Sequence, residues 1–262
     1  RLYRETYTSE VKAGELTGEW AKRLGIPAGI AVAVGAFNAH IGAVGGGIGP
    51  ATLTKIMGTS TCDMIVAWMR VGFVHGVMNT DNMSIIGETI DYGPYGWIDN
   101  FDLNWTPNTT DEQHKRYRFG GQAEIAQWNL FQLANAIFPL IGEAEPLQTI
   151  LSDYAIHYQR KWCNMMAAKL GFKEYQGEND LALFRTLEKL LSAVETDMTL
   201  FYRLLAKIPN DLNTQTVTAW MAILGPSYYS ILDLNEQYLQ DFTQWLQRYL
   251  ARVNFDCLSQ SQ

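Results

Sequence analysis

Hydrophobic residues recur at helical spacing through the second half of the chain. They return every three or four positions at 126–140, 147–170, 184–194, 201–208 and 238–253. Such a stripe is the face that an amphipathic helix buries. Gly171 and Pro209 are suited to end the second and fourth stripes, and Asp180 is a candidate N-cap for the third. The stripes therefore predict helices whose apolar faces form a core rather than a cofactor site.

The pattern differs before residues 64–70, where glycine and β-branched residues prevail. This part reads as a short α/β fragment that has no second half to close its sheet. Turn-forming residues then dominate 93–121. The smaller elements expected are strands at 30–34, 53–57, 83–86 and 88–91, a helix at 36–44, a polar turn at 58–61, and a helix end within 68–78. The expected fold class is α+β, predominantly α-helical.

Composition limits the function. The chain has 262 residues, of which 47% are hydrophobic, and its formal charge is 20 − 27 = −7. An acidic chain of this kind argues against nucleic-acid binding, which needs basic surface. No apolar run is long enough to span a membrane. Three cysteines are too few for a disulfide framework, so a cytoplasmic setting is expected, and the first residue, Arg1, suggests a fragment of a longer chain.

The segment from His75 to Asn82, followed by Asp91-Tyr92-Gly93, carries the clearest chemistry. Mg²⁺ needs hard oxygen ligands on short, rigid segments. Protein kinases supply them from a catalytic-loop Asn and from the Asp of an Asp-Phe-Gly element. Asn82 and Asp91 have that arrangement, and Asp81 is the carboxylate available to act as a base. By spacing alone, the alternative that these residues only cap turns stays equally open.

The identities of the residues in this region are more specific evidence than the spacing of Asn82 and Asp91. The stretch WMRVGFVHGVMNTDNMSI at 68–85 and the stretch TIDYGPYG at 89–96 resemble the selenoprotein O family of pseudokinase-fold protein adenylyltransferases. Further matches follow at Arg116-Tyr117, Phe119, Gln122 and 128–134. The Asn-Gln-Pro of that family is Gly121-Gln122-Ala123 here, a local departure at a helix start. The resemblance extends from about residue 68 to about residue 250.

This resemblance implies a kinase-like C-lobe that uses ATP to transfer AMP to protein hydroxyl groups. Carried over by motif, Asp81 would be the general base. Asn82 and Asp91 would be the ligands of Mg²⁺ or Mn²⁺, with Asp91 also beside the nucleotide. The implied partners are ATP and proteins with hydroxyl side chains, with no nucleic acid and no membrane.

Residues 1–66 resemble a different family, L-ribulokinase, a sugar kinase of the FGGY group with an actin-like domain. The resemblance rests on 19–25, 35–45 and 58–63. In that family the position of Asn38 is a catalytic Asp, and an amide cannot serve as a base. We therefore expect two regions, 1–66 and 67–262, in a chimera or fragment, with the first adding little to the stability of the second.

Three functions follow, in order of preference. The first is a selenoprotein O-like adenylyltransferase whose activity is impaired, because the lobe that clamps the triphosphate is expected to be missing. The second is a remnant of an FGGY carbohydrate kinase. The third is an inactive domain that binds nucleotide or metal, or an inert helical domain, since phosphoryl-type catalysis depends mainly on positioning and electrostatics.

Overall fold

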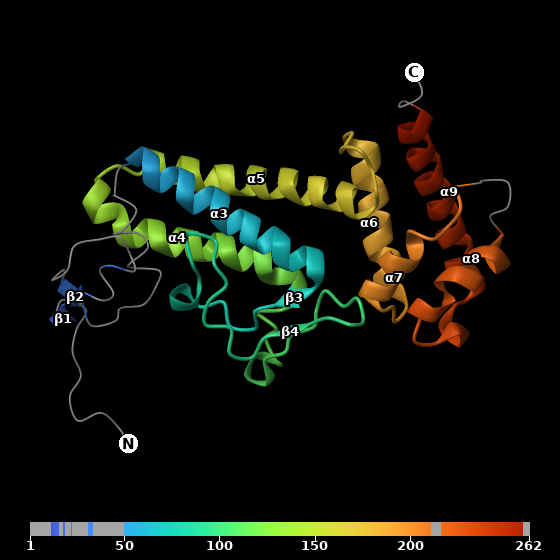
Figure 1. The fold of residues 1–262 in the computed structure, drawn as a ribbon, viewed down its shortest axis with the longest axis horizontal. Coiled ribbons are helices and arrows are strands. Elements are labelled where there is room, and N and C mark those ends of the chain that lie inside the picture. Colours follow the sequence, from blue (N-terminus) through green and yellow to red (C-terminus); the bar gives the residue numbers. More distant parts are fainter. Residues whose placement is uncertain are drawn as a thin grey trace.

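The computed structural model describes residues 12–15, 18, 22, 31–33, 50–210 and 216–258. Figure 1 shows the helices labelled α3, α4 and α5 side by side along the molecule, and α6, α7, α8 and α9 grouped at one end. The α-helices are α3 (Pro50–Val71), α4 (Gln122–Ile141), α5 (Glu145–Lys169), α6 (Glu178–Ala193), α7 (Met198–Leu205), α8 (Val217–Leu224) and α9 (Glu236–Leu258). The predominantly helical α+β class is confirmed.

Two small antiparallel pairs make up the strands of the described residues. β1 (Lys12–Glu15) pairs with β2 (Ala31–Ala33), which lies within the strand expected at 30–34. β3 (Phe73–Val74) pairs with β4 (Gly96–Trp97). The second pair brings the residue ranges before and after the 75–95 segment together, so that segment forms a closed loop at the end of α3.

The helices enclose two hydrophobic cores. One lies among α3, α4 and α5, where Ile65, Trp68, Ala126 and Tyr154 are buried. The other lies among α6, α7, α8 and α9 and the C-terminal end of α5. Met69 and Met165 pack against both cores, so the two are continuous. The apolar stripes of the sequence therefore correspond to core faces, as predicted, and burying them is what stabilises the helices.

The strand expected at 53–57 and the turn expected at 58–61 are both wrong. Both ranges lie inside α3, which runs without interruption from Pro50 to Val71. Cys62, Ile65 and Trp68 follow at helical spacing and are buried against α4 and α5. A short apolar run does not distinguish strand from helix, and here packing against α5 decides in favour of the helix.

Helix α3 also bears on the expected helix end within 68–78 and on the expected boundary between the regions 1–66 and 67–262. Its last residue is Val71, and Gly72 follows with a φ of +74°, so the helix ends seven residues before the end of the expected range, 68–78. The expected boundary between 66 and 67 falls within it. Cys62, Met64 and Ile65 are buried in the core, so the end of the 1–66 region packs with the rest of the chain. The expectation that 1–66 adds little stability stays a prediction, and this burial argues against it.

The strands expected at 83–86 and 88–91 are also wrong, since both ranges are irregular loop. This loop is held by hydrogen bonds from side chains, rather than by backbone hydrogen bonds between paired strands. Asp180 lies in the first turn of α6 rather than at its N-cap, which is Gly177. Its carboxylate accepts a hydrogen bond from the backbone N–H of Gln176 at 2.8 Å, so it orders the preceding loop. α8 had no counterpart in the sequence prediction.

None of the helices described combines the length and the apolar composition that a membrane crossing requires. Cys62 and Cys163 are buried free thiols, and burial raises the pKa of Cys62 to about 11. A protonated, buried thiol behaves as a small hydrophobic side chain. These two cysteines therefore serve as packing residues.

Candidate active site

Three side-chain amides hold the backbone of the 75–82 segment. Gln122, at the start of α4, accepts from the N–H of His75 at 3.1 Å and donates to the carbonyl of Phe73 at 3.0 Å. Asn108 donates to the carbonyl of Gly76, and Asn129 donates to that of Met78, both at 3.0 Å. All three amides are buried, so each bond satisfies a backbone group that water cannot reach. The segment is therefore fixed along its length.

His75 connects this segment to the one that contains Asp91. The backbone N–H of Val77 donates to Nδ1 of His75 at 3.3 Å, so Nε2 carries the proton and donates to the carbonyl of Ile90 at 2.7 Å. Burial lowers the pKa of His75, against the raising effects of the Ile90 bond and of the Asp91 carboxylate. The ring is thus neutral at physiological pH and uses both nitrogens for structure.

Two further contacts bring the same segments together. Nε1 of Trp68, near the end of α3, donates to Oγ1 of Thr89 at 2.9 Å. Gly76 has a φ of +81°, and a Cβ at this position would lie only 2.4 Å from the carbonyl oxygen of Pro94. Only glycine permits so close an approach with that backbone conformation. The 75–82 and 89–94 segments therefore pack directly against one another.

Asn82 ends a short 3-10 turn, Thr80–Asn82, and its amide has a defined orientation. Its Nδ2 donates to the carbonyl of Val77 at 3.1 Å, which leaves Oδ1 as the acceptor atom of the amide. An amide oxygen oriented in this way suits a hard divalent cation. Asp81, beside it in the same turn, is exposed to solvent, as a base that meets an incoming substrate must be.

Asp91 is exposed and has a φ of +49°, a left-handed conformation that non-glycine residues seldom adopt. Strain of this kind clusters at functional sites. The structure thus links Asn82 and Asp91 through one imidazole: Val77 bonds to both Asn82 and His75, and His75 bonds to Ile90. Across the described residues, no cluster of three His, Cys, Asp or Glu side chains forms a complete metal cage. Asn82 and Asp91 carry oxygen atoms of the kind that Mg²⁺ takes as ligands, and their role as ligands stays a prediction.

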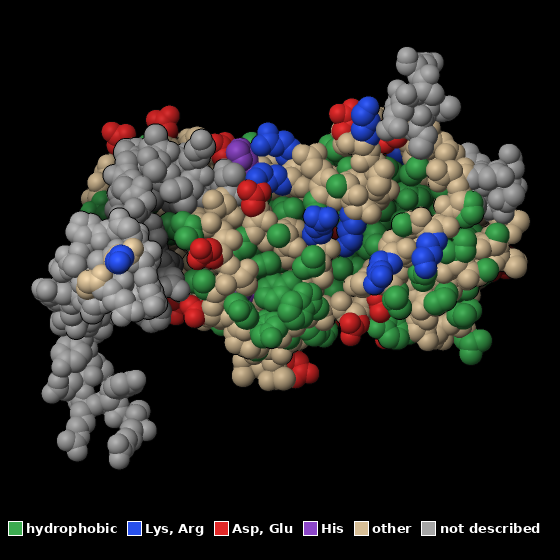
Figure 2. All heavy atoms as spheres, in the orientation of Figure 1, with side chains coloured by type: hydrophobic (Ala, Val, Ile, Leu, Met, Phe, Trp, Pro, Cys, Tyr) green, Lys and Arg blue, Asp and Glu red, His purple; other side chains and the backbone are tan. Residues whose placement is uncertain are grey.

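An aromatic patch adjoins Asp91 on the surface. Tyr92, Tyr95 and Trp97 are 44%, 45% and 54% exposed and surround the buried ring of Phe73. Hydrophobic side chains gather on this face over β3 and β4 (Figure 2). Aromatic rings beside a carboxylate can stack against a planar group of a ligand, while the carboxylate interacts with a charged group of that ligand.

Comparison with known proteins decides the family. The sequence model of the family described as protein adenylyltransferase SelO matches residues 54–262. The chain belongs to this family. It is 51% identical over 201 residues to a protein nucleotidyltransferase YdiU of Rhodopirellula baltica, and 62% identical over 193 residues to one of Aromatoleum aromaticum. A third, from Flavobacterium johnsoniae, is 47% identical over 206 residues.

The match covers most of this chain but a smaller share of its relatives. It takes in 75%, 74% and 78% of the chain, and 37%, 35% and 38% of the relatives from Rhodopirellula, Aromatoleum and Flavobacterium. The SelO family resemblance found at 68–250 is thereby confirmed and extended at both ends. The sugar-kinase resemblance of 1–66 stays a prediction, and Asn38 and the helix expected at 36–44 lie outside the described residues.

Sequence reasoning proposed the residues for the chemistry and missed the side chains that hold their segments. Asp81, Asn82 and Asp91 lie on the two segments that His75 joins, and their roles stay predictions. Asn108 was read only as part of a turn. Gln122 and Asn129 were noted only as residues shared with the family. Their positions in the 3.6-residue helical repeat nevertheless place both on the buried side of α4. A polar residue on an apolar helix face was the available signal, because a buried amide must find partners.

Proposed function

We propose that this chain is the catalytic region of a Mg²⁺-dependent enzyme that transfers AMP from ATP to serine, threonine or tyrosine hydroxyl groups of proteins. The observation that carries the proposal is the His75 network, which fixes the segment of Asp81 and Asn82 against that of Asp91 in a chain of the SelO family. Membership of the family supplies the reaction class, and the network supplies two fixed segments on which a phosphate-handling site can be built.

In this proposal Asp81 acts on the acceptor. Its exposed carboxylate takes the proton of an incoming hydroxyl group, whose oxygen forms a bond to the α-phosphorus of ATP. The bond from that phosphorus to the bridging oxygen breaks, and pyrophosphate leaves with the electron pair. The products are an AMP–protein phosphodiester and pyrophosphate, and the proton remains on Asp81 until solvent removes it.

Asn82 and Asp91 would hold the divalent cation through Oδ1 and a carboxylate oxygen. When bound, Mg²⁺ or Mn²⁺ would neutralise charge that develops on the phosphates. His75 does not touch substrate in this scheme. It is a positioning residue, because its ring sets the place of Val77, which orients Asn82, and that of Ile90, which precedes Asp91.

The kinase-like C-lobe arrangement and a cytoplasmic location are part of the same proposal. Two features support the former: a loop carrying Asp81-Asn82 and a second loop carrying Asp91-Tyr92-Gly93, joined by a histidine. The sugar-kinase alternative rests on residues 1–66 alone and gains no support from the site. The third alternative, a domain that binds nucleotide without transfer, is one outcome of the test.

The test measures transfer and binding separately. The 262-residue chain is incubated with ATP, Mg²⁺ or Mn²⁺ and an unfolded acceptor protein rich in serine, and intact mass distinguishes an AMP adduct from a phosphate adduct. Asp81→Ala should abolish transfer but keep ATP binding by calorimetry. Asp91→Ala should weaken Mg²⁺-dependent binding itself, because this carboxylate is a proposed ligand.

Asp99→Ala is the matched control, since Asp99 is also exposed and lies near β4. It should change neither readout. A phosphate adduct would contradict the proposed reaction. Binding that is metal-dependent without any adduct would favour the inactive nucleotide-binding domain, and undiminished binding in Asp91→Ala would refute the ligand assignment.

A further inference from the structure

Basic side chains are concentrated in one loop beside the proposed catalytic segment. Lys115, Arg116 and Arg118 fall within four residues, and His114 precedes them, in a chain whose net charge is −7. They border an open cleft of about 470 Å³, which is lined by Asp111, His114, Arg116, Arg118, Glu124 and Ile125. The proposed reaction as described above assigns no role to this cleft.

The loop is built to hold its shape. The carboxylate of Asp111, which is buried, accepts from the backbone N–H groups of Arg116 at 2.9 Å and of Tyr117 at 2.7 Å. The carbonyl of Asp111 accepts from the N–H of Lys115 at 2.6 Å, and Lys115 has a φ of +48°. The carboxylate of Asp111 thus stabilises the backbone of the loop. The strained turn at Lys115 fixes the position of the neighbouring Arg116 and Arg118.

Those guanidinium groups keep most of their hydrogen-bonding capacity. The guanidinium of Arg116 lies 4.6 Å from the ring centroid of Trp128, an arrangement that orients a cation without using its N–H donors. Arg118 donates to the carbonyl of Lys115 at 3.3 Å. Within the ranges that the structure describes, no carboxylate forms an ion pair with either arginine. Both can therefore receive an anionic ligand.

The cleft is anchored to the proposed catalytic segment at two points. The hydroxyl of Tyr117 donates to Oδ1 of Asn79 at 2.5 Å, two residues before Asp81. Asn129, next to Trp128 on α4, donates to the carbonyl of Met78. A ligand bound by Arg116 and Arg118 would thus be held by the same elements that position Asp81.

We propose that this cleft binds acidic residues of the acceptor protein, so that the preferred acceptor is a hydroxyl group in an acidic stretch of polypeptide. The inference rests on the proposed function, because it names the substrate class of that site. Arginine recognises carboxylates through planar, paired N–H donors, and exposed charges of this kind guide association. Glu124 also lines the cleft, and its negative charge opposes the binding of acidic residues.

The test measures peptide binding without ATP. Fluorescence anisotropy compares a labelled peptide that carries one serine among glutamates with the same peptide carrying glutamines. The 262-residue chain should prefer the acidic peptide by about tenfold or more, with the preference decreasing as salt increases. The double variant Arg116→Gln, Arg118→Gln should lose this preference, whereas Glu124→Gln should increase it.

Arg248→Gln is the matched control, because Arg248 is an exposed arginine on α9, outside the cleft lining, and it should retain the preference. Thermal unfolding checks that each variant is folded. Equal affinity for both peptides, or an unchanged preference in the double variant, would overturn the proposal. Displacement of the peptide by tripolyphosphate would instead assign the cleft to a phosphate chain. Since ATP is absent, failure of AMP transfer does not affect this readout.

Discussion

Gly76 combines two constraints that a single methyl group would violate. Its φ of +81° disfavours any side chain, and the Cβ of an alanine would lie 2.4 Å from the carbonyl oxygen of Pro94. Backbone cannot move aside as a flexible side chain can. We therefore expect Gly76→Ala to lower the free energy of unfolding by about 3 kcal/mol or more.

Gly93 provides the matched control, because a Cβ there would have no neighbour within 4 Å. Gly93→Ala should change stability by less than about 0.5 kcal/mol. Urea unfolding of both variants measures the difference. Equal stability of the two would mean that the 75–82 and 89–94 segments do not pack as tightly as the structure indicates.

Lys169 supplies a pH-dependent contribution to stability. Its ammonium group donates to the carbonyl of Arg70 at 2.6 Å and lies 4.1 Å from the ring centroid of Tyr202. Burial, with a smaller effect from Arg70, lowers the pKa of Lys169 from 10.5 to about 8. Between these values the unfolded chain binds a proton that the folded chain does not, so this residue makes stability rise with pH.

We expect the stability of the wild type relative to Lys169→Met to rise by about 1–2 kcal/mol between pH 8 and pH 10. Comparing the two proteins cancels the titration of the other groups. Lys189→Met, at an exposed position on α6, controls for the loss of one positive charge. Urea midpoints that stay parallel for wild type and Lys169→Met across this range would contradict the expected change.

At this scale the sequence proposed residues for the chemistry and missed the groups that hold their segments. Asp81, Asn82 and Asp91 are candidates from local spacing and from the family resemblance, and their roles stay predictions. The amides of Asn108 and Asn129 act on residues 32 and 51 positions away in the chain. Such bonds depend on how α4 and the loop that contains Asn108 pack against the 75–82 segment, and a pattern within one segment does not contain that information.

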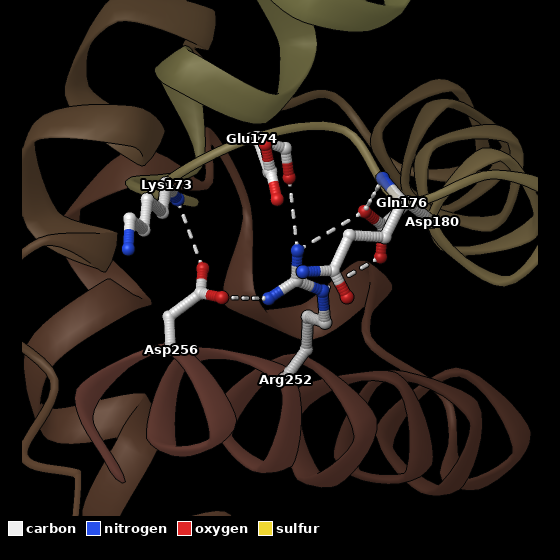
Figure 3. Close-up of polar contacts among 6 residues, drawn as sticks. All are labelled: Lys173, Glu174, Gln176, Asp180, Arg252 and Asp256. Carbon is white, nitrogen blue, oxygen red and sulfur yellow. Dashed lines mark hydrogen bonds and ion pairs between the residues drawn. The ribbon is translucent and has the colours of Figure 1, made fainter. Parts of the chain in front are cut away.

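Arg252 on helix α9 contacts both α6 and the loop before it (Figure 3). Arg252 contacts Asp180 at 2.9 Å, Asp256 at 2.6 Å and the carbonyl of Glu174 at 2.9 Å. Its guanidinium also lies over the ring of Phe172. Against the effect of burial, the N–H of Lys173 and the guanidinium of Arg252 hold the pKa of Asp256 below its usual value.

Lysine keeps the charge of Arg252 but cannot make these contacts at once. We expect Arg252→Lys to destabilise the chain by about 2–3 kcal/mol, because the buried carboxylate of Asp180 would lose its paired donors. Arg248→Lys, one turn earlier on the exposed face of α9, should have little effect. Thermal or urea unfolding compares them, and similar losses in both variants would show that the paired geometry is unimportant.

Elements with a long apolar stripe were predictable, whereas most of the short ones were not. The stripes at 126–140 and 147–170 correspond to α4 and α5, because repeated spacing over several turns excludes a strand. The run at 53–57 is too short for that distinction, and its helix is decided by contacts with α5. Residues 83–91 have apolar residues enough for strands, yet bonds from Trp68 and His75 hold them as loop.

At the scale of the whole molecule, α3 connects the family-matched region to the preceding residues. It lies against both α4 and α5 (Figure 1), and the match to the family starts within it, at residue 54. An apolar core cannot lose one of its three helices without exposing the faces of the other two. The second part of α3 is thus a core element of the region that carries the proposed site.

Two shortened chains test this. One starts at residue 50 and keeps the whole of α3, and the other starts at residue 67 and removes the buried residues Cys62, Met64, Ile65 and Val66. Losing even one large buried side chain costs about 2–5 kcal/mol, so the shorter chain should lose most of its stability and its cooperative unfolding. The chain that starts at residue 50 should unfold in one cooperative transition. Calorimetry measures both chains. Similar unfolding temperatures would show that 67–262 forms its core without residues 50–66 of α3, as an independent domain starting at residue 67 requires.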